Sequence, residues 1–276
     1  MSNFPFVRIE EKIILRISMI NKKIFQQELE DWDKNAQFYI EKNALPYYGF
    51  INEKLIKFYE LKENEKILEA GGATGLITGS NVTIVDFSPK MIEVAKKLNP
   101  QGNFIISSVH KMPVPDKEFD VIIADDLFHH VKAQELLEAT AEEFKRVLKD
   151  DGRLCVFERN SSILPRLFFY LRQPIKKMVK TKNQCSSRNE SIFSKKDLEK
   201  ILKCGFEIQR RKYMFALPFQ ALTILTNVIQ YLFSNKTSRH IQEKTIKFAI
   251  FLETKLNYKF LCAQQCLILI KSAHKK

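Results

Sequence analysis

Residues 66–75 read KILEAGGATG and residues 82–98 read VTIVDFSPKMIEVAKKL. Each stretch opens with a short apolar run rich in β-branched residues, and each run closes on an acidic residue, Glu69 or Asp86. A glycine-rich turn follows Glu69, where backbone can approach a ligand that a Cβ would obstruct. A helical pattern follows Asp86. Strands that end in such turns and helices predict a ligand site at the carboxyl edge of a parallel sheet.

The same alternation continues outward along the chain. Further strand-like runs are NFIIS (103–107), FDVIIAD (119–125) and RLCVFE (153–158), and a helical pattern occupies 136–149. Near-continuous apolar strands separated by helices indicate a parallel sheet covered on both faces. We therefore predict an α/β fold with a Rossmann-like, doubly wound, mostly parallel sheet, a helical N-terminal segment and a C-terminal helical cap.

The pattern divides the chain into four parts. We expect residues 1–60 to form a helical lid or cap, and residues 61–160 to form the core. Residues 161–192 form a basic, aromatic insertion, and residues 193–276 complete the sheet and add a helical cap. In the last part, Ser194 is the expected N-cap of a helix that Gly205 closes. Strands are expected at 206–216 and 260–270.

Composition excludes several classes of protein. The chain has 276 residues, of which 45% are hydrophobic and 22 are Phe, so it is not disordered. Its longest apolar run, 214–233, is interrupted by Pro218 and polar residues, and the N-terminus lacks a clean signal peptide. Five cysteines form no CxxC pair, and no His lies near Cys262 and Cys266. We expect reduced thiols in a cytoplasmic protein and no metal site.

Charge is distributed unevenly. Residues 1–160 carry a net charge of −4, and residues 161–276 carry +17. The basic part could meet anionic lipid, a phosphorylated substrate or nucleic acid, or could only keep the protein soluble. Its segment SSILPRLFFYLRQPIKKMVKTKNQ (161–184) combines aromatic rings with cations, as an interfacial membrane segment does. The alternative is a cap helix that packs on the domain.

Taken in order, these motifs resemble those of class I S-adenosylmethionine (SAM)-dependent methyltransferases, in particular the methyltransferase type 11-like group that acts on quinones, lipids and small molecules. The resemblance covers residues 30–215. It rests on ILEAGGATG, on VDFSPKMIEVAKKL, on SSVHKMPVPDKEFDVIIADDLFHHV (107–131), on FKRVLKDDGRLCVFE (144–158) and on FSKKDLEKILKCGFEI (193–208).

The resemblance implies SAM as cofactor and assigns roles to residues after the first four strands. Glu69 would orient the amino group; Gly71, Gly72, Ala73 and Gly75 would surround the methionine moiety; Asp86 would hold the ribose; Phe87 and Met91 would flank the adenine; Ser108 and Val109 would contact its edge; Ala124 and Asp125 would lie beneath the sulfonium. Structural alternatives are a core position for Met91, a helix N-cap at Asp125 or Asp126, and a strand-end cap at Asp86.

Three departures from the family pattern stand out. Ala73 replaces the middle glycine of the first motif, and Ser108 stands where an acidic residue is frequent. Only LITGSN (76–81) separates Gly75 from the second strand. A crossover with its helix takes about 10–12 residues or more, so the first helix is expected to be about one turn long.

His129 and His130 are the candidate general bases, since neutral imidazole accepts a proton near pH 7. A base is needed only if the acceptor must lose a proton, and one of two adjacent histidines can instead pack or cap a helix. The Asn-Pro-Pro-aromatic motif of amino-group methyltransferases is absent, and ADDLFHH stands in its place. The resemblance therefore implies methyl transfer to an oxygen or carbon of a small-molecule or lipid-like acceptor, and the basic, aromatic segment suggests that this occurs at a membrane surface. The alternatives are an RNA-modifying methyltransferase and a non-catalytic binding subunit of the same fold.

Overall fold

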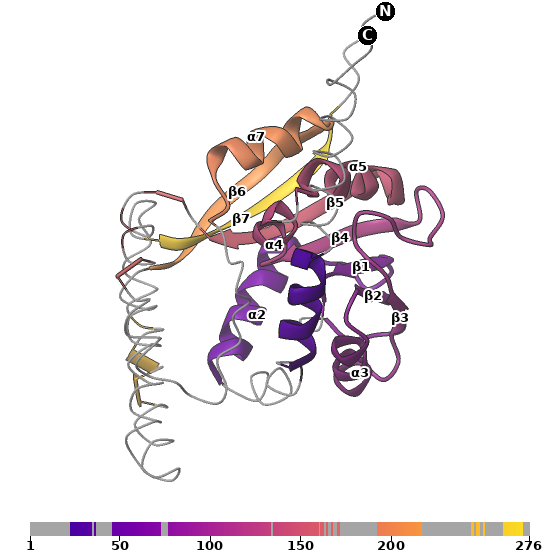
Figure 1. The fold of residues 1–276 in the computed structure, drawn as a ribbon. Helices are drawn as coiled ribbons and strands as arrows, with labels where there is room; N and C mark the ends of the chain where they lie inside the picture. Colours follow the sequence, from indigo (N-terminus) through magenta and orange to yellow (C-terminus); the bar gives the residue numbers. More distant parts are fainter. Residues whose placement is uncertain are drawn as a thin grey trace, which may run out of the picture.

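The computed structural model describes residues 23–34, 36, 46–72, 77–133, 135–159, 192–216 and 262–272, together with 161, 162, 164, 167, 170, 171, 244, 245, 247, 248 and 251. Seven strands form one sheet in the order β3-β2-β1-β4-β5-β7-β6 (Figure 1). Their bounds are β1 Ile67–Ala70, β2 Val82–Asp86, β3 Asn103–Ile106, β4 Phe119–Asp125, β5 Leu148–Arg159, β6 Phe206–Ala216 and β7 Cys262–Lys271.

The sheet is mostly parallel, which confirms the predicted fold class. β1 pairs in parallel with both β2 and β4, and the outer pairs β2–β3 and β4–β5 are parallel too. Only β7 runs the other way, between β5 and β6. The strand order reverses between β1 and β4, and sheets of this type bind ligands beyond the carboxyl ends of the strands at such a point.

Helices cover both faces of the sheet and create two cores. Figure 1 shows α2 (Pro46–Tyr59) and α3 (Pro89–Leu98) on one face, with α5 (Leu137–Val147) and α7 (Lys195–Lys203) on the other. Strand side chains alternate between the faces, so that Ile67 packs with the α2 and α3 side and Leu68 with the α5 and α7 side. The central strands β1, β2 and β4 are buried on both faces, as their apolar sequences predict, whereas β3 is partly exposed.

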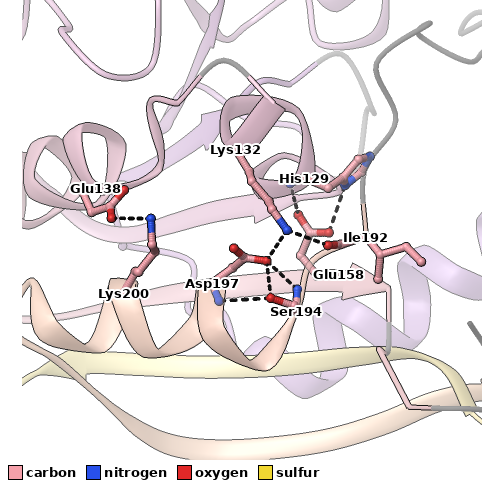
Figure 2. Close-up of polar contacts among 8 residues, drawn as sticks. All are labelled: His129, Lys132, Glu138, Glu158, Ile192, Ser194, Asp197 and Lys200. Carbon is pink, nitrogen blue, oxygen red and sulfur yellow. Dashed lines mark hydrogen bonds and ion pairs between the residues drawn. The ribbon is translucent and has the colours of Figure 1, made fainter.

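Side chains cap the starts of α3 and α7, and the cap at Ser194 is the one that the sequence predicts. The Ser88 side chain caps α3 by accepting a hydrogen bond from Met91 N. Ser194 and Asp197 form a reciprocal capping box at the start of α7, visible in Figure 2. Gly205, one residue beyond the C-cap of α7, has φ +97°, a conformation that favours glycine.

Charged side chains join α7 to the helices beside it. Lys132, in the short helix α4 (Phe128–Ala133), donates to Asp197 Oδ2 at 2.6 Å and to Ile192 O at 3.0 Å. Lys200 of α7 lies 2.7 Å from Glu138 of α5 (Figure 2). These contacts hold α4 and α5 against α7 and the segment just before it.

The structure corrects one local prediction and tests another only in part. β5 starts at Leu148, directly after α5, whereas the sequence predicts a helix to residue 149 and a strand from 153. Leu148 pairs with Phe119, and the register shifts before Arg153 pairs with Val121, so residues 149–152 are an irregular part of the strand. The predicted one-turn helix after Gly75 is not found at residues 77–81, and residues 73–76 lie outside the described residues.

Other predictions fall largely outside the described residues. These are the helix before residue 23, most of the basic insertion, and most of the C-terminal cap at 217–261. Within the described part of the chain, no helix combines the length and apolar character that crossing a bilayer requires. Cys155, Cys204 and Cys266 are buried thiols.

Candidate functional site

Four carboxylates gather at one edge of the sheet. Glu69, Asp86, Asp125 and Glu158 lie at or next to the carboxyl ends of β1, β2, β4 and β5, which are neighbours in the sheet. Because these strands are parallel, their carboxyl ends share one edge. Glu69, Asp86 and Glu158 are buried, and Asp125 is half-buried. Such a concentration of acidic groups favours a cationic ligand.

The glycine turn after β1 touches the strand that carries Asp86. The N–H groups of Gly71 and Gly72 donate to Val85 O at 2.8 and 3.3 Å. Gly71 has φ +67°, and a Cβ at Gly72 would lie 2.5 Å from Cγ of the buried Glu69 side chain. Only glycine therefore fits at residue 72 without moving Glu69. Ala73 and Gly75 lie outside the described residues.

Asp86 is a buried acid held by the start of α3. Its Oδ1 accepts a 2.8 Å hydrogen bond from Ser88 N, and the residue is only 5% exposed. Burial raises the pKa of Asp86 to about 7, against the opposing effect of the Ser88 hydrogen bond, and the Asp33 carboxylate nearby adds to the rise. A carboxylate accepts about four hydrogen bonds, so Asp86 retains capacity for two ribose hydroxyls.

The N-terminal helix at residues 23–34 lies against the loop after β2. Asp33 accepts a 2.5 Å hydrogen bond from the Ser88 hydroxyl. The rings of Phe25 and Phe87 have centroids 5.1 Å apart. Phe87 is the predicted adenine neighbour, so the structure brings a second aromatic ring to it from the predicted lid.

The same helix also contacts α4, the short helix that follows β4. Trp32 donates from Nε1 to Glu28 Oε2 at 3.1 Å, and its ring meets the His130 ring edge-on with centroids 5.1 Å apart. Glu28 Oε2 lies 3.5 Å from His130 Nδ1. The helix at residues 23–34 therefore lies over the carboxyl edge of the sheet; that it opens and closes as a lid stays a prediction.

Asp125 accepts a hydrogen bond from Tyr59, the last residue of α2. The fully buried Tyr59 hydroxyl donates to Asp125 Oδ1 at 2.6 Å. Burial raises the pKa of Asp125 well above its ordinary range, the Tyr59 hydrogen bond opposes this, and the charges of Glu69, Asp126 and Glu158 add to the rise. Sequence reasoning did not find Tyr59, because nothing in its helical stripe distinguishes it from a core residue.

The structure gives the two predicted bases different surroundings. Both lie in the first turn of α4 and not in a loop. His129 is buried, with Nδ1 2.9 Å from Glu158 Oε2, and its backbone N–H donates to Glu158 Oε1 at 3.2 Å (Figure 2). Burial raises the pKa of Glu158 to about 7. The His130 side chain is 13% exposed and faces Glu28 and Trp32.

The remaining predicted residues take packing or local positions. Met91 and Ala124 belong to the two cores, and Val109 is buried in the second. Ser108 Oγ lies 2.6 Å from His110 Nδ1, within the loop after β3. Their predicted contacts with adenine and the sulfonium stay predictions.

Glu158 is a residue that the sequence could have indicated. It ends the apolar run RLCVFE just as Glu69 and Asp86 end theirs. The sequence therefore showed an acidic residue at the end of this strand, but the family resemblance assigns no role to Glu158.

Comparison with known proteins gives a family for the centre of the chain. Residues 68–156 match the methyltransferase domain family. The demethylmenaquinone methyltransferase of Chlorobaculum tepidum is 31% identical over 138 residues, which are 46% of this chain and 56% of that protein. The enzyme of the same name from Thermotoga maritima is also 31% identical over 138 residues, covering 46% and 59%. The chain thus spans somewhat more than half the length of these curated relatives.

Solved structures show the fold. A SAM-dependent methyltransferase from Thermotoga maritima aligns over 68% of this chain and 86% of its own, with a TM-score of 0.50 and 21% identity. The [4+2]-cyclase SpnF aligns over 81% and 80%, with a TM-score of 0.50 and 15% identity. Since one of these is a cyclase, the fold alone does not decide the reaction. The family match, however, runs from β1 into β5 and includes Glu69, Asp86 and Asp125 of the acidic edge, and this part of the chain is a class I SAM-dependent methyltransferase domain.

Proposed function

We propose that this protein transfers a methyl group from SAM to an oxygen or carbon of a small-molecule or lipid-like acceptor. The observation that carries the proposal is the buried Asp86 carboxylate. It lies next to Val85, whose carbonyl oxygen accepts hydrogen bonds from the N–H groups of Gly71 and Gly72. A turn without side chains beside a buried acid suits a nucleoside attached to a flexible amino acid.

The described residues fit such a cofactor. Glu69 would bind its amino group, Gly71 and Gly72 would lie along the methionine moiety, and Asp86 would accept the ribose hydroxyls. Phe87 would contact the adenine. When bound, SAM supplies a methyl group on positively charged sulfur, and that charge would favour the ionised form of the nearby Asp125 carboxyl group.

His130 is the stronger candidate for the proton acceptor. Its side chain is partly exposed, while His129 is buried against Glu158. Glu28, 3.5 Å from His130 Nδ1, would stabilise the imidazolium that forms when an acceptor hydroxyl or acidic carbon loses its proton. The N-terminal helix would exclude water while it covers this edge.

The relatives' names support a small acceptor with an apolar ring. Both are named for action on demethylmenaquinone. The acceptor of this chain is proposed to share that character.

We propose that the protein is cytoplasmic and acts at a membrane surface. Exposed apolar side chains support the contact with a membrane. Leu164, Leu167, Tyr170 and Leu171 are 41–63% exposed and recur at helical spacing, and Phe248 and Phe251 are 54% exposed. These side chains lie within the part of the chain that carries a net charge of +17. Apolar side chains among cations favour binding to anionic lipid headgroups.

The test is methyl transfer by the intact chain. The purified protein, SAM and a reduced demethylmenaquinone analogue would be incubated in anionic vesicles, and product mass would be followed. We expect a 14 Da gain on oxygen or carbon, and about 10²–10⁴-fold slower turnover for His130→Gln with unchanged SAM affinity. A protein that binds SAM but methylates no quinol or phenol would contradict the acceptor class. Equal turnover by His130→Gln would contradict the base.

A further inference from the structure

Three potential metal donors from separate elements meet at the acidic edge. Asp126 follows β4, His129 is in the first turn of α4, and Glu158 is near the end of β5. One ligand atom from each lies within 4.8 Å of the other two. The sequence does not predict this group, because Glu158 lies 29 residues beyond His129.

The spacing of these donors suits one cation. Nitrogen and oxygen ligands bind first-row divalent metals at about 2.0–2.2 Å, so neighbouring ligands of one ion lie roughly 3.0–3.4 Å apart, and opposite ligands of an octahedral ion about 4.2 Å. His129 Nδ1 and Glu158 Oε2 are 2.9 Å apart, and the whole group stays within 4.8 Å, so a small shift of the exposed Asp126 side chain would bring all three donors within reach of one ion. The same 2.9 Å separation is compatible with a shared proton, which is the competing occupant.

Backbone contacts hold two of the three donors in place. The His129 N–H donates to Glu158 Oε1 and so orients the carboxylate whose other oxygen faces the imidazole (Figure 2). The Asp126 N–H donates to the carbonyl oxygen of Phe157, the residue before Glu158, at 2.7 Å. Asp126 has φ +51°, a backbone conformation that is uncommon outside glycine. Hydrogen bonds of this kind fix ligands around bound metals.

Burial makes the group closed on one side and open on the other. His129 and Glu158 are buried, whereas Asp126 is exposed. Catalytic metal sites combine protein ligands with an open position in this way, and structural sites are closed.

We propose that Asp126, His129 and Glu158 bind one divalent first-row cation, of the Mn²⁺, Fe²⁺ or Zn²⁺ type. The imidazole nitrogen favours these ions over Ca²⁺, which takes oxygen ligands. If the proposed function holds, the open side of the ion would bind an acceptor through its oxygen and favour the ionised form of a hydroxyl. That step rests on the proposed function, but binding of the ion does not.

The test is titration of Mn²⁺ into the tag-free, chelator-treated full chain, with unbound Mn²⁺ quantified by its electron paramagnetic resonance signal. Calorimetry with Zn²⁺ and Ca²⁺ would run in parallel. We expect one Mn²⁺ or Zn²⁺ per chain and much weaker Ca²⁺ binding. Glu158→Gln and Asp126→Asn should each weaken Mn²⁺ binding tenfold or more. Asp151→Asn, an exposed acid in β5, is the matched control and should bind as the wild type does.

Thermal unfolding of each variant would show that the fold is kept. Absence of Mn²⁺ and Zn²⁺ binding, or binding that neither Glu158→Gln nor Asp126→Asn weakens, would overturn the proposal and leave His129 and Glu158 sharing a proton. SAM titration of the same samples separates the two proposals. SAM binding without metal binding overturns only the metal site, and metal binding without SAM binding overturns only the proposed function.

Discussion

The Ser88 hydroxyl donates a 2.5 Å hydrogen bond to the Asp33 carboxylate, joining the N-terminal helix to the loop that follows Asp86. Ser88 also accepts from Met91 N and donates its own N–H to Asp86. One residue therefore links the predicted lid, the start of α3 and the proposed ribose ligand. A shift of the N-terminal helix should therefore change the position of Asp86, and a ligand that binds Asp86 should change the position of the helix.

The contact between Phe25 and Phe87 should contribute to SAM binding. An aromatic contact of this kind is worth about 0.5–1.5 kcal/mol, so Phe25→Ala should weaken SAM binding by roughly two- to tenfold in calorimetry. Phe104→Ala, which truncates a partly buried ring near the amino end of β3 and away from the carboxyl edge, is the control and should leave SAM affinity unchanged. Trp32 is the only tryptophan, so its emission should also change when SAM binds. Equal SAM affinity in Phe25→Ala would argue against a lid that closes on adenine.

Asp86 should destabilise the ligand-free protein above neutral pH. Because burial raises its pKa from an ordinary value of about 4 to about 7, the folded state holds a proton that the unfolded state releases. Stability should therefore fall as pH rises from about 4 to 7 and then stay level. Asp86→Asn removes this cost, and urea denaturation at pH 8 should show a gain on the order of 2–4 kcal/mol that shrinks towards pH 5. A variant less stable than wild type at pH 8 would show that Asp86 is not an unfavourable buried charge.

Gly72 should be intolerant of any side chain. A Cβ there would meet Glu69 Cγ at 2.5 Å, and the strand around Glu69 is buried. We expect Gly72→Ala to lower the free energy of unfolding by about 1–3 kcal/mol and to weaken SAM binding. Gly49→Ala is the matched control, since nothing lies within 4 Å of its Cβ position in α2. That change should stabilise the protein by up to about 1 kcal/mol. Similar urea midpoints for the two variants would be inconsistent with the close approach.

The exposed leucines of the basic insertion should bind membranes. Leu167→Gln with Leu171→Gln should reduce cosedimentation with anionic vesicles about tenfold or more, because each inserted leucine contributes about 1.5–3 kcal/mol. Ile106→Gln changes a 58% exposed apolar residue on β3 and should not affect vesicle binding. If the wild type binds RNA but no vesicles at low salt, the membrane proposal would be contradicted and the RNA-modifying alternative would be favoured.

Much of the fold follows from signals that are local in the sequence. The bounds of β2 and β6, the Ser88 and Ser194 caps and the close of α7 at Gly205 depend on residues within one or two turns of one another. The start of β5 was predicted wrongly, because the pairing of Leu148 with Phe119 is a long-range contact that helix-forming neighbours conceal.

The site was predictable only in part, for the same reason. Acidic strand ends identify Glu69 and Asp86 directly. The bond from Tyr59 to Asp125 joins residues 66 apart, and the contact of Ser88 with Asp33 joins residues 55 apart. No pattern within one element reveals such pairs. They exist only once α2 has packed on its face of the sheet and the N-terminal helix has packed over the carboxyl edge.

Calorimetric titration of SAM into the intact chain, repeated with Asp86→Asn and with Asp151→Asn, tests the central claim most directly. The account predicts one saturable site in the wild type, the same affinity for Asp151→Asn, and binding at least tenfold weaker for Asp86→Asn, because hydrogen bonds to a charged acceptor contribute about 1.5–3 kcal/mol each. A wild-type protein that binds no SAM, or an Asp86→Asn variant that binds it as tightly as wild type, would contradict the account.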